Sequence, residues 1–213
     1  DLLYAGWGLL PGAPRVVYAS QPASYADAQA ILGDGRLYLP EEVERELKFE
    51  QVFRFDGFAT GAEAKAIFTS LLPNTNLLAD IPAANNFDPF VPARYQSWLA
   101  ALAAVEPAQR EVLLALLTVE ALETINNHQP LQVGFEAHRA LPRAQWYACA
   151  QIASGSDAAW RAVSDSTFDV FEDLVVEIKD ANPTEICGSA GAMGAVQLLG
   201  ASANRVTIAV DAP

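Results

Sequence analysis

Prolines stand at the start of most stretches with helical periodicity, and they constrain the possible folds of this chain more than any other feature. Proline suits the first helical position because its φ angle is already helical and its missing N–H would have no partner there. The pattern predicts helices that begin at prolines and cover residues 40–47, 92–104, 107–126, 142–152 and 183–199. The acidic residues after Pro40 strengthen the first of these, since they lie at the positive end of the helix dipole.

Three more helices are predicted to begin at capping residues. Ser24, Thr60 and Ser156 have side-chain oxygens that accept a hydrogen bond from the first helical turn, and apolar residues follow each at helical spacing. These helices are expected over residues 24–32, 60–72 and 156–174. Together the predicted helices cover most of the chain.

Extended structure is predicted only in short segments. These are residues 15–19, 36–39 and 205–210, with a change toward strand within 51–58. The predicted fold class is therefore mainly α, with a few short strands near the N-terminus and at the C-terminal end, at the margin of α+β. We expect one α-rich domain over residues 1–213, with a weak boundary in the loop 73–92, because no repeat or low-complexity linker divides the chain.

Composition and charge limit the kinds of molecule that this chain is expected to bind. Hydrophobic residues make up 52% of the chain and charged residues 18%, so we expect apolar surface that other protein chains cover. The net charge of −13, without any basic tract, disfavours direct nucleic-acid binding, which needs clustered Lys and Arg. No apolar run reaches the roughly 18 residues of a membrane span, so no membrane role is expected.

The best predicted interface lies in the loop 73–92, which is rich in proline, asparagine and aromatic residues. Long loops of this kind often cover a neighbouring surface, and Asn86, Phe87 and Phe90 are its candidate contacts. Trp7 is a fourth, within the apolar stretch that begins directly after Asp1. Apolar ends of this kind predict a processed fragment of a larger polypeptide.

A metal site built on the two histidines is disfavoured. His128 and His138 lie near Glu120, Glu123 and Glu136 in the sequence, which are suitable ligand types. However, the histidines have no spacing that would place both on one helical face, and a proline separates them. No metal ligand, cofactor-binding residue or cofactor is predicted.

Nucleophilic catalysis is also disfavoured, although its residue types are present. Cys149 or Ser154 with His138 and Asp157 would form a triad only if the fold gathered them, and no nucleophile motif marks any of them. Both cysteines, Cys149 and Cys187, are predicted to be buried free thiols, which favours an intracellular protein. The glycines after Cys187 lack the spacing of a phosphate-binding loop and indicate close packing instead.

Three classes of function follow from these observations. The favoured one is a structural subunit or processed fragment of a large protein assembly, most concretely a viral capsid or shell protein, located inside the cell or in a virion. The second is a hydrolase-like enzyme domain excised from a larger polypeptide. The third is an all-α binding or scaffold module that recognises another protein through the loop 85–90. No catalytic residue is assigned, so an enzyme is the less favoured reading.

Overall fold

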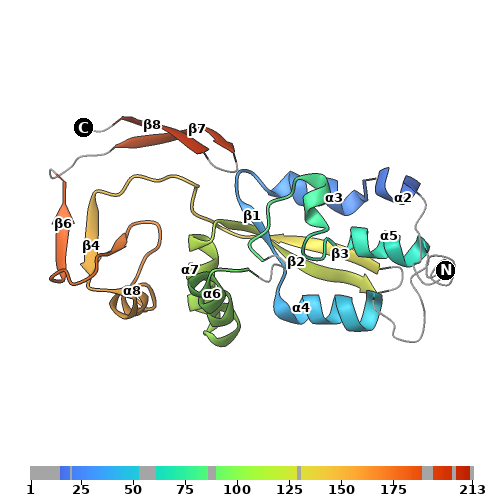
Figure 1. Ribbon diagram of the computed structural model, residues 1–213, viewed down its shortest axis with the longest axis horizontal. Helices are drawn as coiled ribbons and strands as arrows, with labels where there is room; N and C mark the ends of the chain where they lie inside the picture. The colour runs from blue at the N-terminus through green and yellow to red at the C-terminus, as the bar shows by residue number, and fades with distance from the viewer. Residues whose placement is uncertain are drawn as a thin grey trace, which may run out of the picture. The chain divides into compact units, whose positions relative to one another are not determined.

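The fold mixes helices and strands in comparable amounts (Figure 1). The structure is a computed structural model, and it describes residues 15–19, 21–52, 61–85, 90–128, 131–188, 194–202 and 205–211. About 37% of the chain is helical and 29% is strand, and the described strands form three sheets. The predicted mainly α class is therefore wrong, and the protein is α+β.

The chain divides into two compact units, which we describe separately. Unit 1 contains Asp1–Leu99 and Val119–His138, and unit 2 contains Ala100–Thr118 and Arg139–Pro213. Each unit thus combines two stretches of the sequence that are distant from each other. The single predicted domain over residues 1–213 stays a prediction.

Unit 1 is built on a three-stranded sheet with the order β1-β2-β3. These strands are β1 (Arg36–Tyr38), β2 (Val119–His128) and β3 (Leu131–Ala137). Strand β2 pairs in parallel with β1 and antiparallel with β3, and the second pairing shifts register between Ile125 and Asn127. Hydrogen bonds on both edges make β2 the central strand of the unit.

Helices surround this sheet (Figure 1). They are α2 (Arg15–Ala19), α3 (Ala23–Ile31), α4 (Glu41–Glu46), α5 (Gly61–Thr69), the π-helical turn η1 (Leu47–Val52) and the 3-10 turn η2 (Asn76–Ala79). Helices α3 and α5 contact β3, and α4 contacts β2. The buried core joins Tyr25 and Ala28 of α3 to Leu37 of β1 and Ala121 of β2.

Several predictions for unit 1 are confirmed. Helices were expected at 24–32, 40–47 and 60–72, and a strand at 36–39, and each is present with small differences at its ends. Residues 15–19 were predicted to be extended but form helix α2. The predicted change to strand within 51–58 lies largely outside the described residues.

The most consequential error is at residues 107–126, which were predicted to form one helix. Helix α7 (Pro107–Leu116) ends at a turn where Thr118 adopts a left-handed φ of 57°, and β2 follows directly. Val119, Ala121 and Glu123 are all fully buried, which is the two-residue period of a strand with one face in the core. The polar residue Glu123 at a buried position hid this alternation in the sequence.

Unit 2 contains a second three-stranded sheet and a separate hairpin. The sheet has the order β5-β4-β6 and consists of β4 (Cys149–Ala153), β5 (Val175–Glu177) and β6 (Thr184–Cys187). Helix α8 (Ser156–Val163) contacts β4 and β5. Helix α6 (Ala93–Ala104) is present, as predicted for residues 92–104. It begins in unit 1 and ends in unit 2. The hairpin pairs β7 (Ala195–Ser202) with β8 (Arg205–Asp211).

Strands replace helix in two predicted helices of unit 2, and turns replace the second half of a third. Residues 142–148 are irregular and lead into β4, whereas 156–174 is helical only as far as Val163. The predicted helix 183–199 contains β6 and most of β7 instead. Pairing of β4 with β5 and β6, and of β7 with β8, determines the conformation of two of these segments, and local helical periodicity does not reveal such pairing. The predicted strand 205–210 is confirmed as β8.

The described helices are at most 12 residues long. None of those helices combines the length and the apolar character that crossing a membrane requires.

The carboxylate of Glu120 on β2 holds the loop between α3 and β1. Its Oε2 accepts hydrogen bonds from the backbone N–H of Gly33 at 2.6 Å and of Gly35 at 3.1 Å. A Cβ atom at Gly35 would overlap the Glu120 side chain, so glycine is required for this approach. Hydrogen bonds to charged groups contribute about 1.5–3 kcal/mol each, so this contact fixes the entry into β1.

We predict that Glu120→Ala lowers the free energy of unfolding by about 2 kcal/mol, because two backbone donors lose their charged acceptor. Glu136→Ala is the matched control, since this exposed glutamate lies on the neighbouring strand β3 and its loss should change stability by less than about 0.5 kcal/mol. Urea unfolding of both variants measures the difference. Equal effects of the two substitutions would contradict the assigned role of Glu120.

Candidate functional site

The register between β4 and β6 places the two cysteines of the chain directly opposite each other. Cys149 pairs with Cys187 in this antiparallel ladder, with their Cα atoms 4.0 Å apart, and the two sulfurs form a disulfide. The bond joins residues 38 apart in sequence. The prediction of two free thiols is therefore wrong, and the intracellular location inferred from free thiols loses its premise.

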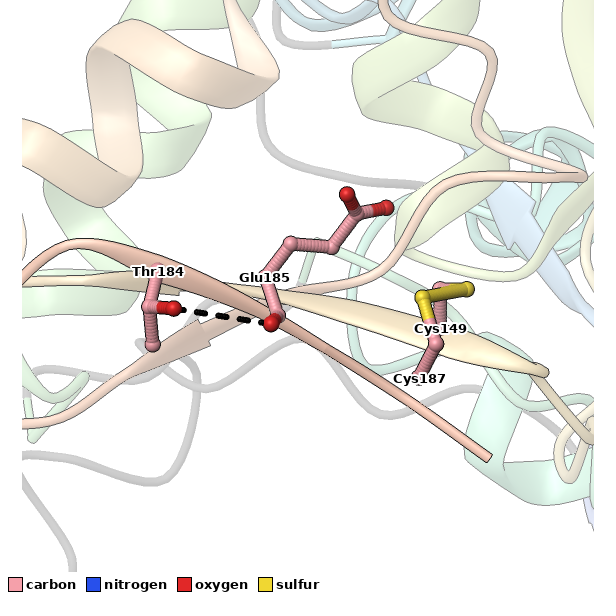
Figure 2. The surroundings of a disulfide bond; sticks show 4 residues. All are labelled: Cys149, Thr184, Glu185 and Cys187. Carbon is pink, nitrogen blue, oxygen red and sulfur yellow. Dashed lines mark hydrogen bonds between the residues drawn. A yellow bond between two sulfur atoms is a disulfide. The ribbon is translucent and has the colours of Figure 1, made fainter. Parts of the chain in front are cut away.

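Glu185 lies beside the disulfide. It precedes Cys187 by two residues on β6, so both side chains project from the same face of the strand. Figure 2 shows the Glu185 carboxylate and the two cysteines together, and one ligand atom from each of the three residues lies within 4.8 Å of the others. Cys149 is half-buried, whereas Glu185 and Cys187 are exposed. The cluster is therefore accessible to solvent and to solutes.

An acidic cleft of about 640 Å³ adjoins this cluster. Its lining combines Cys149 and Glu185 of the two strands with residues of the segment 165–174. The charged residues of this lining are four acids, Asp165, Glu172, Asp173 and Glu185, with no basic residue. Such a surface attracts cations and repels anions.

Side-chain hydrogen bonds hold the segment 165–174 in place. The Tyr147 hydroxyl donates to the Val170 carbonyl at 3.0 Å, and Gln145 Nε2 donates to the Phe171 carbonyl at 2.7 Å. The guanidinium of Arg139 lies 3.7 Å from the centre of the Phe171 ring, a cation–π contact. The acidic wall of the cleft is thus anchored to the irregular segment before β4.

Two ionisable groups at or beside this wall, Asp165 and Tyr147, have shifted pKa values. Hydrogen bonds from the Thr167 hydroxyl and backbone N–H lower the pKa of Asp165. The pKa of the Tyr147 hydroxyl is raised, first by burial and then by the negative charges of Asp169, Asp173 and Glu172. Hydrogen bonding therefore favours the ionised form of Asp165 in this wall.

The predicted interface residues fall mostly outside the described structure. Trp7, Asn86 and Phe87 lie in residues that the structure does not describe. Phe90 is described, and 88% of its surface is exposed. The loop 73–92 is also more structured than predicted, because it contains η2 and a bridge between Leu37 and Ala83.

The histidines and glutamates weighed as metal ligands have separate roles. His128 Nδ1 lies 3.2 Å from Glu46 Oε1, and His138 Nδ1 lies 2.9 Å from the Val119 carbonyl oxygen. Glu120 binds the glycine loop, as described above. Glu123 is fully buried in the core of unit 1.

The residues weighed for nucleophilic catalysis are not gathered by the cleft. Cys149 lines it but is oxidised, and neither Ser154 nor Asp157 is part of its lining. Ser154 lies in the turn after β4, Asp157 lies in the first turn of α8, and His138 belongs to unit 1. The cleft therefore does not support the hydrolase reading.

The glycines near Cys187 are used for packing where they are described. The Gly188 N–H donates to the Ala148 carbonyl at 2.9 Å and extends the ladder between β4 and β6. A Cβ atom at Gly194 would overlap the indole of Trp146, as the predicted close packing requires. Gly191 lies outside the described residues.

Sequence reasoning missed the cluster of Cys149, Glu185 and Cys187 because it read Glu185 and Cys187 as part of a helix. A strand over 184–187 places these two residues on one face, and that two-residue spacing was the available signal. The third member, Cys149, is brought in only by pairing across 38 residues. This pairing has no local signature.

Comparison with family models, with curated proteins and with solved structures finds no match for this chain. The prediction of a viral capsid or virion protein has no support from these comparisons. We do not retain it.

Glu123 is a fully buried carboxyl group of unit 1. Its side chain is fully buried on β2, opposite Phe135, and neither carboxylate oxygen has a hydrogen-bond partner among the described residues. Burial raises the pKa of this carboxyl well above its usual value of 4.5. The protonated form is therefore favoured in the folded protein, and ionisation opposes folding.

We predict that folding stability falls as the pH rises from about 4.5 through the raised pKa of Glu123, because the unfolded chain releases this proton more readily. Glu123→Gln should remove this decline and be more stable than the natural chain at pH 7, because an amide has no proton to release. Urea unfolding between about pH 4 and pH 8 measures it. Glu136→Gln, on the exposed side of β3, is the control and should keep the decline. A Glu123→Gln chain with the natural pH dependence would refute this assignment.

Proposed function

We propose that this chain is a structural subunit of a larger protein assembly and that it associates with a second copy of itself through strand β8. The observation that carries this proposal is the exposed hairpin β7–β8. These strands pair only with each other among the described strands. An isolated two-stranded hairpin is marginally stable in water, so it gains from a further partner strand.

Strand β8 of this hairpin is both apolar and exposed. Every residue of β8 is exposed, and Val206, Ile208 and Val210 keep 59%, 47% and 50% of their surface accessible. Their alternation places them on one face, and Val196 and Leu198 of β7 stand opposite Val210 and Ile208. A free strand edge beside an aliphatic face is a template for pairing with another strand.

The sequence of β8 is complementary to itself in antiparallel orientation. If two copies pair about a two-fold axis at Ile208, Arg205 of each chain faces Asp211 of the other, and Val206 faces Val210. Opposite residues then match in charge at the ends and in hydrophobicity at the centre. A symmetric dimer requires this self-complementarity of a single surface. The match is what favours a second copy over an unrelated partner.

The alternatives have less support. The all-α scaffold module is incompatible with the α+β fold, and its predicted contacts lie mainly outside the described residues. The enzyme reading would need a cleft that gathers the proposed catalytic residues, and the described cleft includes only Cys149 of them. The expectation of other protein chains as partners agrees with the exposed hairpin.

We expect Ile208→Lys to weaken self-association at least about tenfold, because two lysines would stand opposite each other at the two-fold axis. The natural chain should show a monomer–dimer equilibrium in sedimentation velocity, and this variant should shift toward monomer. Thr207→Lys is the matched control, since its side chain lies on the other face of β8, beside Ala209 of the second copy. A natural chain that stays monomeric at all concentrations would contradict the proposal.

Exchanging the charges at Arg205 and Asp211 tests the register of the proposed β8–β8 pairing directly. Arg205→Asp or Asp211→Arg alone creates two like-charged pairs across the two-fold axis and should weaken the dimer. The double variant Arg205→Asp with Asp211→Arg restores both pairs, so dimerisation should return toward the natural value. The dimer dissociation constants of the four chains give this comparison. Additive losses in the double variant would refute β8–β8 pairing, even if the chain associates by another surface.

A further inference from the structure

We propose that Cys149, Cys187 and Glu185 form a redox-gated zinc site, which the disulfide closes and which reduction opens to one Zn²⁺ per chain. This inference concerns a different surface from the proposed self-association through β8 and does not depend on it. It rests on the three ligand atoms gathered by β4 and β6, all within 4.8 Å of one another.

The strand geometry suits metal ligation after the sulfurs separate. Tetrahedral zinc with Zn–S bonds of about 2.3 Å holds two sulfurs about 3.8 Å apart. Cys149 and Cys187 are directly opposite in the ladder with Cα atoms 4.0 Å apart, so rotation about their side-chain bonds spans this separation without moving the strands. Glu185 supplies the third ligand from the same face of β6 (Figure 2).

The chemical types of the three ligands determine which metal ion they prefer. Two thiolates favour zinc over magnesium and calcium, which prefer oxygen ligands. One carboxylate completes a set of three protein ligands, and a non-protein ligand can occupy the fourth tetrahedral position. The neighbouring acids Asp165, Glu172 and Asp173 of the cleft add negative potential, which favours the approach of a cation.

Reduction of the Cys149–Cys187 disulfide is a chemically balanced step when the reductant is a dithiol. The dithiol transfers two electrons and two protons to the Cys149–Cys187 disulfide, whose S–S bond breaks to give two thiols while the dithiol becomes a disulfide. Zn²⁺ then displaces the two thiol protons into solvent and forms two Zn–S bonds. Oxidation by a disulfide compound, with release of Zn²⁺, reverses the sequence.

The test uses the full chain and zinc alone. The protein is reduced with a phosphine, the reductant is removed without oxygen, and bound zinc is measured after gel filtration. Reduced chain should retain one Zn²⁺, and oxidised chain should retain none. Cobalt(II) serves as a spectroscopic probe, because thiolate ligands give a charge-transfer absorption that carboxylates alone do not.

Variants distinguish this site from adventitious binding. Cys149→Ser and Cys187→Ser should each lose the charge-transfer absorption of a dithiolate site. Glu185→Gln should keep both thiolates but lower zinc affinity by at least the roughly 10–100-fold that loss of a ligand's supporting partner costs. Glu177→Gln on β5 of the same sheet is the matched control and should bind zinc as the natural chain does.

Three results would overturn the proposal. One is a reduced chain that binds no zinc, and another is a Cys149→Ser, Cys187→Ser double variant that binds as much as the natural chain. The third covers the case in which reduction unfolds unit 2. Zinc should then restore a cooperative thermal transition to the reduced chain, and a transition unchanged by zinc would refute the site.

Discussion

The need of each strand to pair its backbone N–H and C=O groups governs both units of this protein. Strand β2 meets this need on both edges, with β1 in parallel and β3 antiparallel, and β4 does so with β5 and β6. These two central strands carry the buried residues around which helices pack. Strand β8 has one unpaired edge among the described strands, as β7 and the edge strands of the two sheets do, and it combines that edge with seven exposed residues. Backbone pairing organises the two sheets, and the unpaired edge of β8 is therefore the proposed surface for association.

Strand register also determines which reactive side chains lie close together. Pairing of β4 with β6 sets Cys149 against Cys187, and the two-residue period of β6 adds Glu185 to the same face. The cross-link and the proposed ligand set thus arise from one ladder. The acidic segment 165–174 lies beside them and is held by hydrogen bonds from Gln145 and Tyr147. Association through β8 and metal binding at β6 use separate strands, so either can fail experimentally without affecting the other.

Local signals in the sequence predicted those elements that depend on local interactions. Pro40 and the acids after it identify α4, and the β-branched alternation of 205–210 identifies β8. Prediction failed where a distant partner determines the conformation. The apolar run after Pro107 looks helical through residue 126, but pairing with β1 and β3 makes its second half a strand. The candidate site was missed for the same reason, because its members come together only through pairing of Cys149 with Cys187, which are 38 positions apart in the sequence.

The most direct test of the account is an isotope-filtered NMR experiment on an equal mixture of labelled and unlabelled chains. Within one strand Val206 and Val210 are four residues apart, or about 13 Å, too far for a methyl–methyl nuclear Overhauser effect. Across the proposed two-fold axis they stand opposite each other with Cβ atoms about 5 Å apart. We predict an intermolecular effect between the methyl groups of these two valines. Its absence at concentrations where the chain is dimeric, or contacts from β8 to another segment instead, would contradict pairing of β8 with its own copy.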